Sequence, residues 1–219
     1  DLDGTLVDSA ADLAAAVNAM LADYGREPLP VPQVRLMIGD GVAMLVARAL
    51  AARDCRQADA AAAQRLFMRH YESCATSLTT AFPGAAHALQ SLRDEGIPLA
   101  VCTNKPARIS AEILGSLGLA LYFARVIGGD SLAFRKPDPR VLLALTDAFA
   151  VRPESSLLVG DSEVDAATAH SAGMPFVLMR HGYRRGPADE ISCVAGLDSF
   201  DELPALVRSL PPVYRGSVT

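Results

Sequence analysis

The hydrophobic pattern of the first part of the chain predicts helices. Along residues 9–24, apolar side chains recur at spacings of four, three, one and three, which places them on one side of an α-helix. They are Leu13, Val17, Met20, Leu21 and Tyr24. Ser9 suits the N-cap of this helix, and Gly25 suits its end. Apolar stripes over residues 41–52 and 58–78 predict two more helices, and no strand is expected between residues 12 and 80.

From residue 82 onward, short apolar runs alternate with helical patterns. The apolar runs cover residues 98–103, 124–128, 156–160, 175–179 and 192–195. The helical patterns lie near residues 84–95, 107–117, 139–149, 164–172 and 199–209. Strands that alternate with helices in this way form a parallel sheet with helices on both faces. The predicted fold class is therefore α/β, with a doubly wound parallel sheet.

The two patterns together predict a split core. We expect residues 1–11 and 81–219 to form the α/β core and residues 12–80 to form a helical cap inserted into it. In open α/β sheets, ligands bind beyond the carboxyl ends of the strands, and Asp1, Thr103 and Asp161 fall at such ends. Because a strand that ends at Asp1 needs about five apolar residues before it, we expect a first strand to precede residue 1 in the working protein.

The composition narrows the classes of partner. Hydrophobic residues make up 51% of the 219 residues, and the formal net charge is −5, so charge gives no reason to expect binding to nucleic acid or to an anionic membrane. No apolar run approaches the roughly 20 residues of a membrane-spanning helix. The four cysteines show no metal-binding or redox spacing, which favours reduced thiols in a cytoplasmic protein. A monomer and a homodimer both stay open.

Four short polar runs follow or lie near the expected strand ends. They are Asp1-Leu2-Asp3-Gly4-Thr5, Thr103-Asn104, Lys136-Pro137-Asp138-Pro139 and Gly160-Asp161-Ser162-Glu163-Val164-Asp165. Together they supply a carboxylate nucleophile, a second carboxylate two residues later, a hydroxyl, an ammonium and an acidic pair. This set of groups fits the transfer of a phosphoryl group on Mg²⁺. The expected partner is a small-molecule phosphate ester.

Asp1 and Asp3 are the expected catalytic carboxylates. Asp1 would attack phosphorus to form an aspartyl-phosphate. Asp3 would protonate the leaving alkoxide and then activate water against the phosphoenzyme. Gly4 and Thr5 let the chain turn so that both carboxylates face one pocket. Two solvated loop acids are the alternative, which the other three motifs disfavour.

Asp161 and Asp165 are expected on the metal side of the site. Mg²⁺ takes few protein carboxylates and keeps waters and substrate oxygens as its other ligands. Asp1, Asp161 and the main-chain carbonyl of Asp3 would supply a set of oxygen ligands. Asp165 could orient a metal-bound water or hold Lys136, or it could be only an acid favoured at the start of a helix. These alternatives stay open.

The remaining candidates would bind the substrate or stabilise its charge. Thr103 and Asn104 offer a hydroxyl and an amide donor to the oxygens of the transferring group. Lys136 offers an ammonium to the charge that develops on those oxygens. Lys105 also follows a motif strand, but it precedes Pro106 at an expected helix start and could lie at the surface, so Lys136 is preferred. Arg48, on the helix over residues 41–52, could pair with a substrate carboxylate, or it could lie on a solvated helix face.

The four motifs resemble the signature motifs of the haloacid dehalogenase superfamily of phosphatases. Three further runs resemble the phosphoglycolate phosphatase branch. They are Gly128-Gly129-Asp130-Ser131-Leu132, Ala172-Gly173-Met174-Pro175 and His181-Gly182-Tyr183-Arg184-Arg185-Gly186. The resemblance implies a Rossmann-like core with a helical cap inserted after the first motif, and Mg²⁺ held by Asp1, the Asp3 carbonyl and Asp161. It also implies a phosphomonoesterase that acts on 2-phosphoglycolate.

Other functions share the same core motifs. A phosphatase of a sugar phosphate, a pyrophosphatase and a phosphomutase all stay open, although a phosphomutase needs a basic cluster in the cap that the sequence does not display. A dehalogenase is disfavoured because carbon–halogen displacement does not need the acid that Asp3 supplies. A domain that only accepts phosphoryl groups is disfavoured by the presence of both Asp3 and Lys136.

Overall fold

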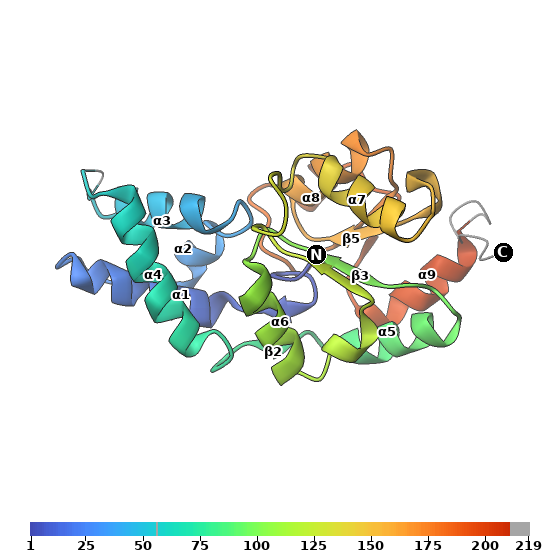
Figure 1. Ribbon diagram of the computed structural model, residues 1–219, viewed down its shortest axis with the longest axis horizontal. Helices are drawn as coiled ribbons and strands as arrows, with labels where there is room; N and C mark the ends of the chain where they lie inside the picture. Colours follow the sequence, from blue (N-terminus) through green and yellow to red (C-terminus); the bar gives the residue numbers. More distant parts are fainter. Residues whose placement is uncertain (56, 211–219) are drawn as a thin grey trace.

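The N-terminal helices gather at one end of the molecule (Figure 1). The computed structural model describes residues 1–55 and 57–210. In it the chain forms α1 (Ala10–Asp23), α2 (Val31–Arg35), α3 (Val42–Ala51) and α4 (Ala60–Cys74). α1 packs along α4, and the apolar stripe expected for α1 is buried except for the half-buried Tyr24. The pattern does not predict α2, because a helix of five residues is too short to show periodicity.

The chain leaves the α/β part of the molecule and returns to it at one place. β1 (Val7–Asp8) pairs in antiparallel fashion with β2 (Thr80–Ala81), and this register aligns Val7 with Ala81. Neither strand is predicted, because two residues carry no recognisable alternation. The division into a core of residues 1–11 and 81–219 and a cap of residues 12–80 stays a prediction.

The rest of the chain alternates between strands and helices, as its hydrophobic pattern indicates. The strands are β3 (Ala100–Cys102), β4 (Arg125–Ile127), β5 (Leu158–Gly160), β6 (Phe176–Met179) and β7 (Ala195–Leu197). The helices are α5 (Ala85–Asp94), α6 (Ala107–Ser116), α7 (Arg140–Ala148), α8 (Glu163–Ser171) and α9 (Leu203–Ser209). Four 3₁₀ turns lie at Ala120–Tyr122, Pro153–Ser155, Ala188–Glu190 and Phe200–Glu202. β3 and β4 are parallel, as are β5, β6 and β7.

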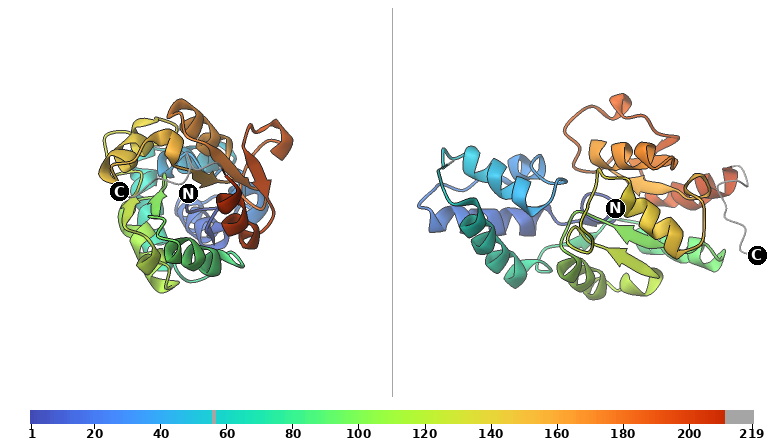
Figure 2. Two further views of the ribbon diagram at one scale, coloured as in Figure 1. Left: turned by 90° about the vertical axis from the view of Figure 1, so that its right-hand side faces the viewer. Right: turned by 45° about the horizontal axis from the view of Figure 1, so that its top comes forward.

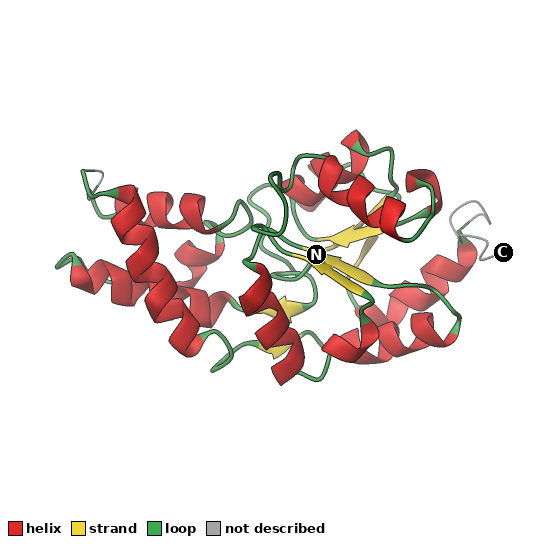
Figure 3. Cartoon of the chain, in the orientation of Figure 1, coloured by secondary structure: helices red, strands yellow, loops and turns green. Residues whose placement is uncertain are grey.

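Helices cover both faces of these strands, so the doubly wound α/β fold is confirmed (Figures 2 and 3). Side chains alternate between the two faces of a strand, and β6 follows this rule. Phe176 and Leu178 belong to the core beneath α7 and α8, whereas Val177 and Met179 belong to the core shared with α5 and α9. A strand that is buried on both faces reads as a continuous apolar run, which is why residues 175–179 show no polar alternation.

Asp1 lies between the two groups of parallel strands (Figure 1). Its main-chain nitrogen donates a hydrogen bond of 2.8 Å to the carbonyl oxygen of Val159 in β5. The carboxyl ends of β3 and β5 point toward the same region, from which Thr103 and Asp161 continue. Among residues 1–55 and 57–210, no helix has both the length and the apolar character needed to cross a membrane.

Candidate active site

Lys136 links two of the expected site carboxylates. Its Nζ lies 2.8 Å from Oδ1 of Asp1 and 2.5 Å from Oδ1 of Asp165. The Lys136 side chain is 3% exposed and that of Asp165 is fully buried. Two charges so far from solvent are stable only when they are paired. The structure therefore brings the Lys136 ammonium and the Asp1 carboxylate together, although the two residues lie far apart in sequence.

Three carboxylates form an acidic cluster beside this lysine. Asp1, Asp161 and Asp165 each offer a ligand atom, and these atoms lie within 4.8 Å of one another. Hard oxygen donors at this spacing suit a cation such as Mg²⁺. The chain leaves room for Asp161 by placing glycines against it, since a Cβ at Gly4 would lie 2.4 Å from Oδ2 of Asp161 and a Cβ at Gly182 would lie 2.0 Å from its Cβ.

Asp161 is held by neutral donors. Thr5 Oγ1 donates to Oδ1 at 2.8 Å, and the Tyr183 main-chain N–H donates to Oδ2 at 2.6 Å. Burial raises the pKa of Asp161 to about 7, and the nearby charge of Asp165 adds to this shift. Burial disfavours the charged carboxylate unless a cation compensates it. A divalent ion at this position would supply that compensation.

Asp165 both holds Lys136 and stabilises the start of a helix, which are two of the roles that the sequence leaves open. It accepts the ion pair from Lys136, and its Oδ2 accepts a 2.6 Å hydrogen bond from Ser162 Oγ at the start of α8. Ser162 and Asp165 form a capping box that satisfies the first N–H groups of this helix. Burial opposes the charged form, but the Lys136 ammonium outweighs it, and the pKa of Asp165 lies below its ordinary value.

Asp3 faces a second lysine. Lys105 Nζ donates to Oδ1 and Oδ2 of Asp3 at 2.8 and 3.1 Å, and Ser9 Oγ donates to Oδ1 at 2.5 Å. The sequence leaves a surface position open for Lys105, but the residue is only 5% exposed, and its Nζ lies 4.7 Å from the ring centroid of Tyr71. Ser9 precedes α1 as expected, but its hydroxyl makes no cap hydrogen bond and binds Asp3 instead.

Thr103 and Asn104 are buried at the end of β3. The Asn104 amide donates to the carbonyl oxygens of Gly39 and Lys136 at 2.9 and 3.0 Å. These bonds tie the loop before α3 to the loop that carries Lys136. The Asn104 side-chain amide therefore donates only to main-chain oxygens, and its Oδ1 has no partner among the described residues. That geometry differs from the expected donation to a phosphoryl group.

Arg48 pairs with Asp40 in the loop before α3. Its guanidinium lies 2.5 Å from Oδ2 of Asp40 and donates to the carbonyl oxygen of Met37 at 2.8 Å. Asp40 also pairs with Arg185, from the loop after β6. These contacts hold the Arg48 guanidinium against the loop before α3. A role of Arg48 in binding a substrate carboxylate stays a prediction.

A small cavity lies between the carboxylates and the N-terminal helices. Its volume is about 40 Å³. The α/β part contributes Asp1, Asp3, Thr103, Asn104, Lys105 and Pro106, and the helical part contributes Leu13, Ile38, Gly39, Gly41, Val42, Leu45 and Tyr71. One wall is therefore ionic and the opposite wall is largely apolar, with the Tyr71 hydroxyl as its polar side-chain group. The Asp1 and Asp3 side chains that border the cavity are 10% and 13% exposed.

Comparison with known proteins agrees with this architecture. The model of the haloacid dehalogenase-like hydrolase family matches residues 1–179. A phosphoglycolate phosphatase of Cereibacter sphaeroides (strain ATCC 17025) is 47% identical over 96% of this chain and 96% of its own length. The phosphoglycolate phosphatase of Rhodospirillum rubrum is 44% identical over 93% of this chain and 87% of its own length.

A crystal structure shows the same fold. A predicted phosphoglycolate phosphatase from Haemophilus somnus 129PT superposes with a TM-score of 0.89 and 32% identity, covering 94% of this chain and 95% of that one. The matches span both the helical and the α/β parts of the molecule, and the resemblance of the four motifs is confirmed. The chain belongs to the haloacid dehalogenase-like hydrolases.

Proposed function

We propose that this protein is a magnesium-dependent phosphomonoesterase that hydrolyses 2-phosphoglycolate to glycolate and phosphate. The observation that carries the proposal is the single buried Lys136 shared by Asp1 and Asp165, next to an acidic cluster that suits a divalent cation. Full-length relatives named phosphoglycolate phosphatases, at 47% and 44% identity, support the choice of substrate.

Asp1 would be the nucleophile. Its Oδ1 pairs with Lys136 at 2.8 Å, and Asp1 borders the cavity. Attack on phosphorus forms the Asp1–phosphate bond and breaks the bond to the ester oxygen. Lys136 would stabilise the charge on the phosphoryl oxygens throughout this step.

Asp3 would be the general acid and base. It is two residues from Asp1 and is oriented by Lys105 and Ser9. In its protonated form it would donate to the departing glycolate oxygen, and as a carboxylate it would accept a proton from the water that attacks the phosphoenzyme. Ser9 and Lys105 hold the carboxyl group in the orientation that both steps require.

Asp1, Asp161 and Asp165 are the side chains that would hold or surround the magnesium ion, together with the Asp3 carbonyl. The ion would neutralise negative charge on the phosphoryl group and on the acidic cluster. The raised pKa of Asp161, about 7 because of burial, agrees with a site that is completed by a cation. Thr103 closes the same end of the cavity.

The cavity lies between the site carboxylates and the helical part, so these helices would border the substrate. The relatives named phosphoglycolate phosphatases, at 47% and 44% identity, favour 2-phosphoglycolate over a sugar phosphate. We further propose a cytoplasmic protein, since all four cysteines are free thiols and such thiols suit a reducing compartment.

Initial rates on a panel of phosphate esters test the proposal. The panel contains 2-phosphoglycolate, glucose 6-phosphate, pyrophosphate and ethyl phosphate, each with Mg²⁺ and with EDTA. We expect the highest kcat/KM for 2-phosphoglycolate and loss of activity in EDTA. A flat profile across the panel would remove the substrate assignment, and full activity in EDTA would remove the metal.

A further inference from the structure

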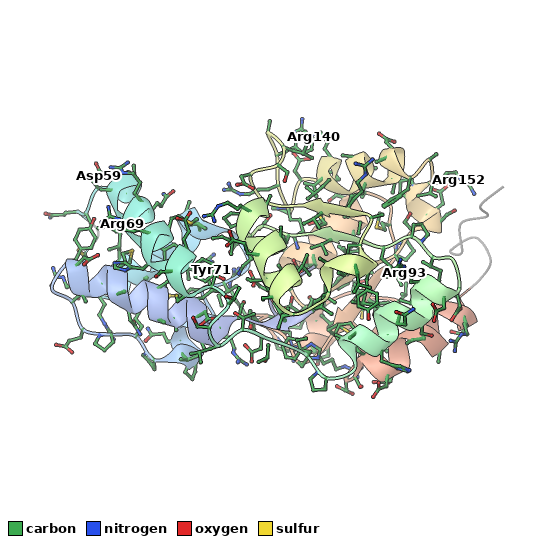
Figure 4. The ribbon with its side chains drawn as sticks, turned by 60° about the horizontal axis from the view of Figure 1, so that its bottom comes forward. Asp59, Arg69, Tyr71, Arg93, Arg140 and Arg152 are labelled. Atoms are coloured by element: carbon green, nitrogen blue, oxygen red, sulfur yellow. The ribbon has the colours of Figure 1, made fainter. Side chains whose placement is uncertain are left out.

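Tyr71 is a cavity-lining residue whose buried hydroxyl has no hydrogen-bond partner among the described residues. The residue lies in the last turn of α4, where Figure 4 labels it, and it is fully buried. Among the described residues, two buried side-chain atoms lack a hydrogen-bond partner, namely Tyr71 Oη and Asn104 Oδ1. Both residues line the same cavity. A buried hydroxyl without a partner is costly, so its presence in an apolar wall points to a ligand that completes it.

Tyr71 lies beside one cation, Lys105, and burial together with the carboxylates of Asp3 and Asp12 raises its pKa. Lys105 Nζ lies 4.7 Å from the centroid of the Tyr71 ring and within hydrogen-bond distance of both oxygens of Asp3. An ammonium carries three N–H donors. A phenol O–H and an ammonium together form a donor-rich end of the cavity, which matches a carboxylate better than a neutral sugar hydroxyl or a cation.

The position of Asp3 assigns this end of the cavity to the leaving group. On the proposed function, the phosphoryl group lies against Asp1 and Lys136, and the ester oxygen lies against Asp3. The substituent on that oxygen must then extend away from the acidic cluster. Lys105 joins Asp3 to Tyr71, so the substituent extends toward these two side chains.

We propose that Tyr71 is a specificity-determining residue whose hydroxyl donates a hydrogen bond to the carboxylate of the leaving group, with Lys105 as the ionic partner of the same carboxylate. This inference rests on the proposed phosphatase function. It defines the substrate class as phosphate esters of short hydroxy acids. Arg48 is not needed for this recognition, and its guanidinium binds Asp40 and the Met37 carbonyl oxygen.

The test compares Tyr71→Phe with the wild type on two esters of matched size. 2-Phosphoglycolate carries the carboxylate, and ethyl phosphate carries a methyl group in its place. A hydrogen bond to a charged group is lost on the first substrate alone, so we expect kcat/KM for 2-phosphoglycolate to fall about 10- to 100-fold, mainly through KM. We expect kcat/KM for ethyl phosphate to change less than about twofold.

Product inhibition gives a second readout. The inhibition constant of glycolate should rise in Tyr71→Phe, whereas that of inorganic phosphate should stay the same. Since the hydroxyl has no partner in the protein, the melting temperature of the variant should equal or exceed that of the wild type. Tyr24→Phe is the matched control, since Tyr24 is a half-buried tyrosine outside the cavity lining. It should change neither kcat/KM for the two esters nor the inhibition constants of glycolate and phosphate.

The outcomes separate the two proposals. An unchanged kcat/KM for 2-phosphoglycolate in Tyr71→Phe, or an equal loss on both esters, would overturn the role of Tyr71 while leaving a wild-type phosphatase in place. Absence of magnesium-dependent turnover in the wild-type protein would instead refute the proposed function itself.

Discussion

Replacing Lys136 with methionine should destabilise the protein by removing the shared partner of two buried carboxylates. Methionine keeps much of the side-chain length but leaves Asp1 and Asp165 without the ammonium that lies 2.8 and 2.5 Å from them. At an effective dielectric constant of about 20, one such contact corresponds to roughly 6 kcal/mol of attraction before desolvation is subtracted. Breaking one side of a buried pair costs about 3–5 kcal/mol in measured cases, and we expect a loss of this size.

The pH dependence of this loss follows from Asp165. Lys136 holds the pKa of Asp165 below its unfolded value of 3.8. A carboxylate with a depressed folded-state pKa stabilises the protein above the unfolded value, and this stability disappears as the pH falls through the folded value. The wild type therefore keeps this stability at both pH 8 and pH 4. In the variant the unpaired, buried carboxylates have raised pKa values and take up protons by pH 4, so the difference between wild type and variant should be full at pH 8 and smaller at pH 4.

Urea denaturation in EDTA, followed by circular dichroism at pH 8 and pH 4, measures the effect. Arg125→Met, which removes an exposed cation on β4, is the control and should change stability by less than about 0.5 kcal/mol. The reasoning would be refuted if Lys136→Met were no less stable than this control at pH 8, or if its loss were the same at both pH values.

Two further predictions concern the metal. Gly182→Ala should displace Asp161, since the new Cβ would lie 2.0 Å from the Asp161 Cβ. We expect Mg²⁺ binding to weaken at least about tenfold, because disturbing the support of a metal ligand costs 10- to 100-fold in affinity. Gly115→Ala, in open space on α6, is the control and should bind Mg²⁺ as the wild type does; if titration calorimetry gave Gly182→Ala the wild-type affinity, Asp161 would not be a ligand. Burial raises the pKa of Asp161 to about 7, whereas Mg²⁺ would bind the charged carboxylate. The Mg²⁺ affinity should therefore rise between pH 6 and pH 8, and binding should release a proton. Calorimetry in buffers of different ionisation enthalpy measures that proton, and a pH-independent affinity would exclude Asp161 as the titrating ligand.

The sequence predicts the parts of the site that lie at strand ends. Thr103 and Asp161 follow apolar runs that are buried on both faces, and parallel strands bring their carboxyl ends together regardless of sequence separation. Lys136 has no strand of its own to mark it, and it is found because its motif accompanies the other three. Asp165 is found for the same reason, although its contact with Lys136 depends on how α8 begins.

The contacts made across the helical part could not be predicted. Lys105 is buried because Tyr71, from α4, packs against it. The sequence around either residue does not predict this contact. Arg48 illustrates the opposite case, because a cation on a helix near the site is neutralised by Asp40 from the preceding loop. Side chains of this kind are placed by tertiary packing, whereas periodicity reports only which face of an element is buried.

The central claim is that Asp1 takes the phosphoryl group before water does. Asp3→Asn should remove the base that activates water while leaving Mg²⁺ binding in place, with turnover reduced about 10²- to 10⁴-fold. Acetyl phosphate is a small substrate whose leaving group needs no acid, so this variant should accumulate a phosphoenzyme from it. Peptide mass spectrometry of the quenched Asp3→Asn protein is the most direct measurement. The account predicts one phosphoryl group on Asp1, and recovery of unmodified Asp1 at a time when phosphate has been released would contradict it.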